Sequence, residues 1–259
     1  MTLVLTEDRG PVRHVVLNRP EKRNAMHPEL VLAIGAAFSE AAADPDVHCV
    51  VLRGEGHMFS SGMDFGALGA LAAAPEHLRA FRKECIEAWN AAEEMTKPVV
   101  CQIHGACLGG ALELALACDL RVMADDAVMG LVETRIGLIP DIGGCSRLPA
   151  IVGLGRAKEL VLASRVIGAA EAERIGLVNR VAPAADLDAA TDTLVGELLA
   201  CAPIAVGLSK RVLDAAAKPA LSATLELEVL AQNVCALSAD FAEGARALAE
   251  KRQPAFSGR

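Results

Sequence analysis

Strand-like and helix-like segments alternate through the first half of the chain, which leaves few fold classes open. Apolar runs flanked by charge, as at 47–52, are typical of buried strands, whereas apolar residues three and four positions apart indicate one buried helix face. We predict strands at 3–5, 12–17, 47–52, 99–103 and 119–123, and helices at 29–43, at 76–95 and in an apolar segment ending at 117. The alternation predicts an α/β core with mostly parallel strands.

The second half of the chain has a different pattern. From residue 146 onward it is helical apart from a turn at 176–183, and three long Ala- and Leu-rich helices are expected at 186–201, 203–217 and 221–252. The glycine-rich segment 54–69 is expected to be a loop. A shift in composition near residue 190 divides the chain into an α/β core at 1–190 and a helical region at 191–259.

The charge balance and the aromatic content exclude several classes of partner. Lys and Arg total 25 and Asp and Glu total 33, a net charge of −8, which disfavours a nucleic-acid surface and, more weakly, an anionic membrane surface. With no Tyr, one Trp and six Phe, the composition disfavours an aromatic platform for stacked bases. The N-terminus lacks a basic region followed by an apolar run, so we expect a cytoplasmic protein with no membrane or nucleic-acid partner.

Motifs for several common chemistries are missing. The eight cysteines include no C-x-x-C pair and no zinc-ligand spacing, and we expect most of them to be buried, reduced thiols. The chain has no G-x-x-x-x-G-K-[ST], H-E-x-x-H or G-x-S-x-G motif. We therefore predict no metal site and no separate cofactor.

Two glycines before the apolar helix form the first candidate site. A helix's first turn has N–H groups without an intrahelical partner, and glycine lets a ligand approach them, so the N–H of Gly110 is a candidate oxyanion donor. Glu113 follows three residues later on the same helix face. The alternative is a tight turn in which Glu113 only complements the helix dipole.

The loop F-S-S-G-M-D at 59–64 is the second candidate. It follows a predicted parallel strand, where ligands of α/β folds bind, and the Met63 N–H is a candidate second donor. The alternative is an ordinary surface loop.

Two acidic residues around the apolar run I-G-L-I are the third candidate. Carboxyl groups beside an apolar wall have raised pKa values and serve as acids, which is the role considered for Glu133 and Asp141. For Glu133 the alternatives are a solvated loop residue or an ion pair with Arg135 or Arg147. For Asp141 the alternative is an N-cap role in the helix that follows.

Together these segments resemble the crotonase family, also called the enoyl-CoA hydratase/isomerase family. The similarity runs in order over nearly the whole chain. Its main motifs are L-N-R-P-x-x-x-N-A at 17–25, F-S-S-G-M-D at 59–64, H-G-x-x-L-G-G-x-x-E-L at 104–114 and G-L-I-P-D-I-G-G at 137–144. The resemblance implies a spiral α/β core of ββα turns with a C-terminal helical region that mediates trimerisation, giving a homotrimer or a dimer of trimers.

The resemblance also implies an acyl-CoA thioester substrate. Its carbonyl oxygen would accept hydrogen bonds from the Met63 and Gly110 amides, and CoA would lie along the loops at 22–25 and 63–66. Coenzyme A would be part of the substrate. The residues carried over as substrate-binding are Lys22, Arg23, Ala25, Ser61, Met63, Asp64, Phe65, Gly66 and Gly110.

Glutamates at the positions of Glu113 and Glu133 hold a water molecule in the family's hydratases, which favours hydration of a 2-enoyl-CoA. This chain has Asp141 where hydratases commonly have glycine, and an acid there resembles the family's isomerases. The alternatives are therefore an enoyl-CoA or dienoyl-CoA isomerase that uses Asp141, and a non-catalytic acyl-CoA-binding protein. Phe65-Gly66 also replaces an isoleucine–lysine pair that contacts CoA in some members.

Overall fold

Two sheets form the framework of the protein in a computed structural model that describes residues 2–72 and 75–258. The larger has the strand order β1-β2-β3-β4-β6-β9, in which only the β1–β2 pair is antiparallel. The smaller has the order β5-β7-β8. The strands are β1 (Val4–Arg9), β2 (Val12–Leu17), β3 (Cys49–Gly54), β4 (Val99–Ile103), β5 (Ala106–Leu108), β6 (Leu120–Ala124), β7 (Val128–Gly130), β8 (Ile167–Gly168) and β9 (Arg180–Ala182).

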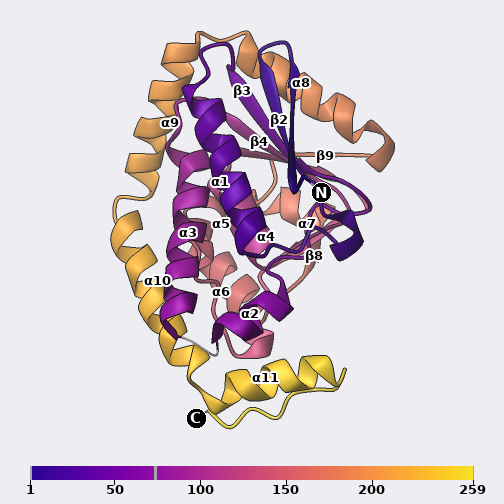
Figure 1. Ribbon diagram of the computed structural model, residues 1–259. Helices are drawn as coiled ribbons and strands as arrows, with labels where there is room; N and C mark the ends of the chain where they lie inside the picture. The colour runs from indigo at the N-terminus through magenta and orange to yellow at the C-terminus, as the bar shows by residue number, and fades with distance from the viewer. Residues whose placement is uncertain (1, 73–74, 259) are drawn as a thin grey trace.

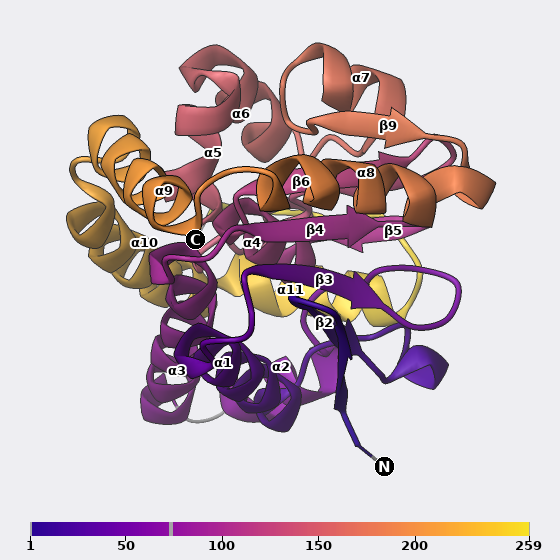
Figure 2. The same ribbon diagram turned by 90° about the horizontal axis from the view of Figure 1, so that it is seen from above.

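Helices surround these sheets, and Figures 1 and 2 show α9 and α10 running along the same side of the molecule as α3. The α-helices are α1 (Pro28–Ala43), α2 (Phe65–Ala72), α3 (Pro75–Glu94), α4 (Gly110–Ala117), α5 (Gly144–Val152), α6 (Leu154–Leu162), α7 (Ala169–Arg174), α8 (Leu187–Leu199), α9 (Pro203–Ala217), α10 (Leu221–Ala236) and α11 (Ala239–Ala249). Short 3₁₀ turns lie at η1 (Pro20–Lys22), η2 (Glu133–Ile136) and η3 (Ala184–Asp186).

The core lies where β4 and α4 meet the surrounding helices. Every residue of β4 and every residue of α4 is buried, which explains why neither segment has a polar face in the sequence. Burying one large aliphatic side chain stabilises the fold by about 2 kcal/mol. Because every residue of α4 is buried, the N-terminus of α4 lies inside the molecule and not at its surface.

The predicted α/β class and the mostly parallel sheet are confirmed. The β4 strand has the predicted bounds, and α1, α3 and α9 begin and end within one residue of prediction. The expected boundary near residue 190 falls inside α8, which packs against β4, β6 and β9.

Five predictions of local structure are wrong. The expected loop at 54–69 contains the start of α2, since Asp64 Oδ1 accepts hydrogen bonds from the amides of Gly66 and Ala67 and caps that helix. The sequence H-G-A-C at 104–107 is expected to be a short loop but contains the start of β5. The region after 146, expected to be helical, contains β8 and β9. These strands have only two or three residues each, which is too short to show a period. The strand expected at 3–5 extends to Arg9.

The fifth error is the helix expected at 221–252, which is two helices. The break follows α10, and Ser238 caps α11 by accepting a hydrogen bond from the Phe241 amide at 3.1 Å. No single helix among the described residues is long and apolar enough to cross a membrane; a pair at 184–199 and 203–217 passes that test only together and is bent by 102°.

Candidate active site

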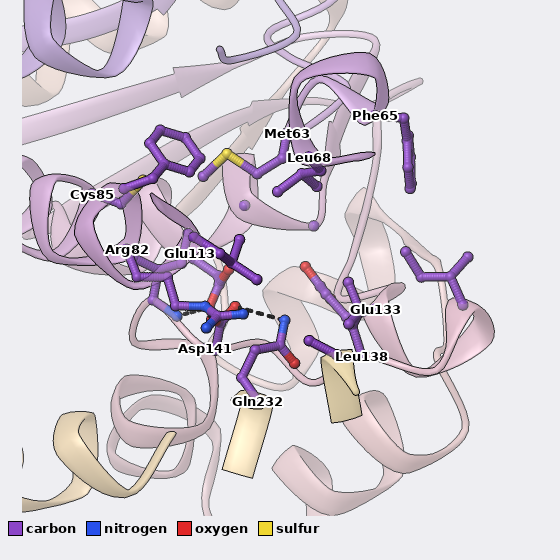
Figure 3. Close-up of a pocket in the computed structure, with 18 of the residues that line it drawn as sticks. Met63, Phe65, Leu68, Arg82, Cys85, Glu113, Glu133, Leu138, Asp141 and Gln232 are labelled. Carbon is purple, nitrogen blue, oxygen red and sulfur yellow. Dashed lines mark hydrogen bonds and ion pairs between the residues drawn. The ribbon is translucent and has the colours of Figure 1, made fainter. Parts of the chain in front are cut away.

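Residues from all three candidate segments of the sequence line a single pocket (Figure 3). Its walls come from the loop after β3, from α3, from the start of α4, from the segment 132–142 and from α10 and α11. Most of the lining is apolar, including Leu68, Leu78, Phe81, Ile136 and Leu138. The polar side chains are Ser61, Arg82, Glu113, Glu133, Asp141 and Gln232.

The two candidate amides lie at this pocket. Gly110 is the first residue of α4, so its N–H has no intrahelical acceptor. Met63 forms a parallel bridge with Met26, in which the Met26 amide donates to Gly62 O and the Asp64 amide donates to Met26 O, both at 2.8 Å. That pattern uses the neighbours of Met63 and leaves its own N–H directed away from Met26. Neither candidate amide has a hydrogen-bond acceptor among the described residues.

A close backbone approach brings these two amides together. Gly62 has φ +93°, and a Cβ atom built on it would lie 2.5 Å from Leu108 O and 3.4 Å from the Gly110 nitrogen. Only glycine fits there, because a side chain would collide with the backbone in front of α4.

Asn24 fixes the loop that carries Met63. It is fully buried, and its Nδ2 donates to the carbonyl oxygens of Glu55, Met58 and Phe59 at 2.8, 3.1 and 3.0 Å. Ser60 Oγ in turn donates to Asn24 O at 2.8 Å. The sequence analysis included Asn24 in a motif without giving it a role, because these partners lie more than 30 positions away.

Glu113 is held by the backbone across the pocket. Its buried carboxylate accepts hydrogen bonds at Oε1 from the amides of Ile142 at 2.8 Å and Gly144 at 2.9 Å. Burial, and then the neighbouring carboxylates of Glu133 and Asp141, raise the pKa of Glu113 well above its usual value. A role confined to the helix dipole does not account for this position, since the side chain spans to another loop.

Glu133 stands against the turn before α4. A Cβ atom built on Gly109 would lie 2.9 Å from Glu133 Oε1, while Oε2 is buried with no hydrogen-bond partner among the described residues. Burial, with a further contribution from Asp141, raises the pKa of Glu133 to about 8. The alternative ion pairs are wrong, because Arg135 donates to Ser164 O at 2.6 Å and Arg147 pairs with Glu93.

Asp141 also lines the pocket and is not an N-cap. The cap position of α5 is Gly143, and no side chain caps that helix. The Asp141 carboxylate instead forms an ion pair with Arg82 of α3 and accepts a hydrogen bond from Gln232 Nε2 of α10 at 3.2 Å (Figure 3). Burial raises its pKa to about 6, and Arg82 limits the rise.

The helix α10 anchors the loop between Asp141 and α5. Glu228 accepts hydrogen bonds from the Gly143 amide at 2.7 Å and from the Ser146 amide and hydroxyl at 2.6 Å each. Gln232 Oε1 accepts one from the Ile139 amide at 2.9 Å. The sequence analysis missed Arg82, Gln232 and Glu228, because helical periodicity gives no sign of which distant loop a buried polar residue will meet.

The residues carried over as CoA contacts divide into two groups. Ser61, Met63, Phe65 and Gly110 line the pocket, and Phe65 is 49% exposed at its mouth. Lys22, Arg23, Ala25, Asp64 and Gly66 do not line it.

Lys22 and Arg23 lie exposed on the η1 turn, and the Arg23 carbonyl accepts a hydrogen bond from the Ser61 amide at 3.0 Å. The basic turn is therefore connected directly to the pocket loop. The Asp64 carboxylate is already engaged: its Oδ2 lies 2.7 Å from Arg19 Nη1 in an ion pair, and its Oδ1 caps α2.

The site contains no metal-binding arrangement. Among residues 2–72 and 75–258, no group of three or more His, Cys, Asp or Glu side chains is placed to hold a metal ion.

This fold, with backbone amides and carboxyl groups around an apolar pocket, is that of enzymes acting on acyl-CoA thioesters. Residues 7–259 match the family described as enoyl-CoA hydratase/isomerase, and the chain belongs to that family.

Two relatives and one solved structure are similar to this chain over nearly its whole length. The chain is 33% identical to the probable enoyl-CoA hydratase echA8 of Mycobacterium tuberculosis, over 99% of this chain and 98% of the relative. It is 32% identical to the peroxisomal Delta(3,5)-Delta(2,4)-dienoyl-CoA isomerase of Arabidopsis thaliana, over 95% and 92%.

A crystal structure of an enoyl-CoA hydratase from Mycobacterium avium subsp. paratuberculosis K-10 superposes with a TM-score of 0.89 at 31% identity, covering 98% of both chains. The relatives have two different reaction names, so the reaction has to be argued from the site.

Proposed function

We propose that this protein is an enoyl-CoA hydratase, which adds water across the 2,3 double bond of a 2-enoyl-CoA. The observation that carries the proposal is that Glu113 and Glu133 both line the pocket, while neither has a cationic partner among the described residues. Asp141, in contrast, is bound to Arg82. The two glutamates are thus the carboxyl groups free to act on a water molecule and a substrate carbon.

The proposed reaction proceeds through a thioester enolate. The Met63 and Gly110 amides hold the thioester oxygen, and each such donor contributes about 3 kcal/mol in known oxyanion holes. One glutamate takes a proton from water as the water oxygen bonds to C3, and the other donates a proton to C2. The proposal needs no cofactor besides the CoA of the substrate.

The assembly is also a proposal. Helices α9 and α10 expose large apolar side chains, among them Leu208, Val212, Leu227, Leu230 and Val234. Large exposed apolar patches mark interaction surfaces. This surface supports self-association, which we propose gives a homotrimer or a dimer of trimers. We further propose that CoA lies along the basic η1 turn.

A second candidate function is isomerisation of an enoyl-CoA or a dienoyl-CoA. The observation that favours it is that Asp141 lines the pocket and is not a helix cap. With Glu133, it would provide two acids above one acyl chain, able to remove a proton from one carbon and return it to another.

Product identification with 2-enoyl-, 3-enoyl- and 3,5-dienoyl-CoA thioesters separates the proposals. For a hydratase, Glu113→Gln and Glu133→Gln each lower kcat for crotonyl-CoA hydration by about 10² to 10⁴-fold, whereas Asp141→Asn retains hydration at neutral pH. Full activity of either glutamine variant would reject these roles.

The same panel tests the alternatives. Loss of double-bond migration in Asp141→Asn, with no hydration by the unmodified protein, would establish the isomerase. Binding of acyl-CoA without turnover of any thioester would point to the non-catalytic alternative.

A further inference from the structure

Arg82 is a buried cation in the pocket wall, outside every motif of the family resemblance. Its side chain is 4% exposed, and it forms an ion pair with the Asp141 carboxylate, which is 9% exposed. Arg82 Nη1 also donates to Asn233 Oδ1 on α10 at 2.9 Å. With the hydrogen bond from Gln232, α3 and α10 hold the two oxygens of Asp141 (Figure 3).

Glu133 has the opposite surroundings. It lines the same pocket, yet no cation pairs with it and its Oε2 accepts no hydrogen bond within the described residues. A buried carboxylate oxygen with no hydrogen-bond donor or cation beside it disfavours the charged form of the group.

Neighbouring buried carboxyl groups divide their protons according to these environments. Like charges at close range disfavour double ionisation, so the anion forms where a cation and hydrogen-bond donors are present. Arg82 and Gln232 both contact the Asp141 carboxylate and stabilise its anion. The negative charge of Asp141 helps to raise the pKa of Glu133. Glu113 Oε1 accepts two backbone hydrogen bonds, which favour its anion and oppose the effect of burial on its pKa.

We propose that Arg82 is a positioning residue of the reaction: it holds Asp141 as an anion, and this leaves Glu133 carrying the proton that is delivered to C2. The inference rests on the proposed function for the fate of that proton. In hydration, Glu113 accepts a proton from water while the water oxygen bonds to C3, and Glu133 gives its proton to C2. Exchange with solvent then returns Glu113 to the anion and Glu133 to the acid.

The proposal fixes the direction of a pH effect. Without Arg82, the buried Asp141 protonates and its negative charge beside Glu133 disappears. The pKa of Glu133 then falls, so the basic limb of the kcat/KM profile moves to lower pH. Asp141→Asn removes the same charge and moves the limb in the same direction.

The experiment compares Arg82→Met, Asp141→Asn, the double variant and Arg82→Lys. We expect the limb to move down by about one pH unit in the first two variants, a size typical of one neighbouring charge. The double variant shows no further movement, because Arg82 acts through Asp141. Arg82→Lys, which keeps a cation, stays close to the unmodified protein.

A matched control and a second readout make the test specific. Arg79→Met removes an exposed arginine one turn earlier on α3 and leaves the profile unchanged. An infrared titration of the substrate-free protein follows the protonated carboxyl band that Glu133→Gln abolishes, and this band titrates at lower pH in Arg82→Met.

Two results would overturn the inference: an unmoved limb and band in both Arg82→Met and Asp141→Asn, or additive shifts in the double variant. If Arg82→Met does not fold, two variants still test the inference. They are the double variant, which removes both charges, and Arg82→Lys. Failure of the proposed function can be distinguished from failure of this inference. Even if the unmodified protein does not hydrate any enoyl-CoA, the infrared band either shifts or does not shift in Arg82→Met.

Discussion

Replacing Glu133 by glutamine is expected to weaken catalysis and stabilise the fold at the same time. The side chain is half-buried, and its Oε2 atom is fully buried with no hydrogen-bond partner among the described residues. In the unfolded chain it ionises at its ordinary pKa of 4.5, whereas in the folded protein the pKa is about 8. Folding at neutral pH therefore has to return a proton to Glu133, and glutamine removes that requirement.

The size of the effect follows from the two pKa values. Each tenfold change in proton affinity is worth about 1.4 kcal/mol, so the rise from 4.5 to about 8 corresponds to an upper bound of about 5 kcal/mol. Local relaxation and water entry reduce such penalties, and we expect about 2 kcal/mol of added stability above pH 8. Because the folded-state pKa is raised, the unmodified protein loses this stability as pH rises from 4.5 to 8, and the difference between the two proteins vanishes below pH 4.5.

The assay is urea denaturation at fixed protein concentration across that pH range, combined with crotonyl-CoA hydration. Glu226→Gln, at an exposed position of α10, is the matched control and shows no pH-dependent gain. A stability difference between Glu133→Gln and the unmodified protein that is independent of pH would refute the reasoning, since the gain has no other source here than the proton.

Two further substitutions test how the site is built. Gly62→Ala places a Cβ 2.5 Å from Leu108 O at φ +93°, so we expect kcat for hydration to fall by about 10²-fold with the circular dichroism spectrum unchanged; full activity would argue against the Met63 amide as a donor. Glu228→Ala leaves the donors of Gly143 and Ser146 without their acceptor, so the free energy of unfolding in urea falls by about 3 kcal/mol, and wild-type stability would show that the loop is held in another way.

Local sequence patterns determined the class of fold and the three segments that meet at the site. Apolar periodicity is a property of neighbouring residues, which is why β4, α1 and α3 were predicted closely. The glycines at 109 and 110 marked the start of α4 because a close approach and a positive φ at Gly109 leave little choice of residue. Glu113, Glu133 and Asp141 stood out because acids beside apolar residues are unusual.

The tertiary structure alone decided the state of those acids. Whether Asp141 caps a helix or lines the pocket depends on Arg82 and Gln232, which reach it from α3 and α10. A carboxyl group's ionisation is set by burial and by the charges that folding brings within a few ångströms, and no local pattern encodes that distance. The sequence therefore specified which residues are present at the pocket, and the packing of α3 and α10 around the loop specified which of them is free to exchange a proton.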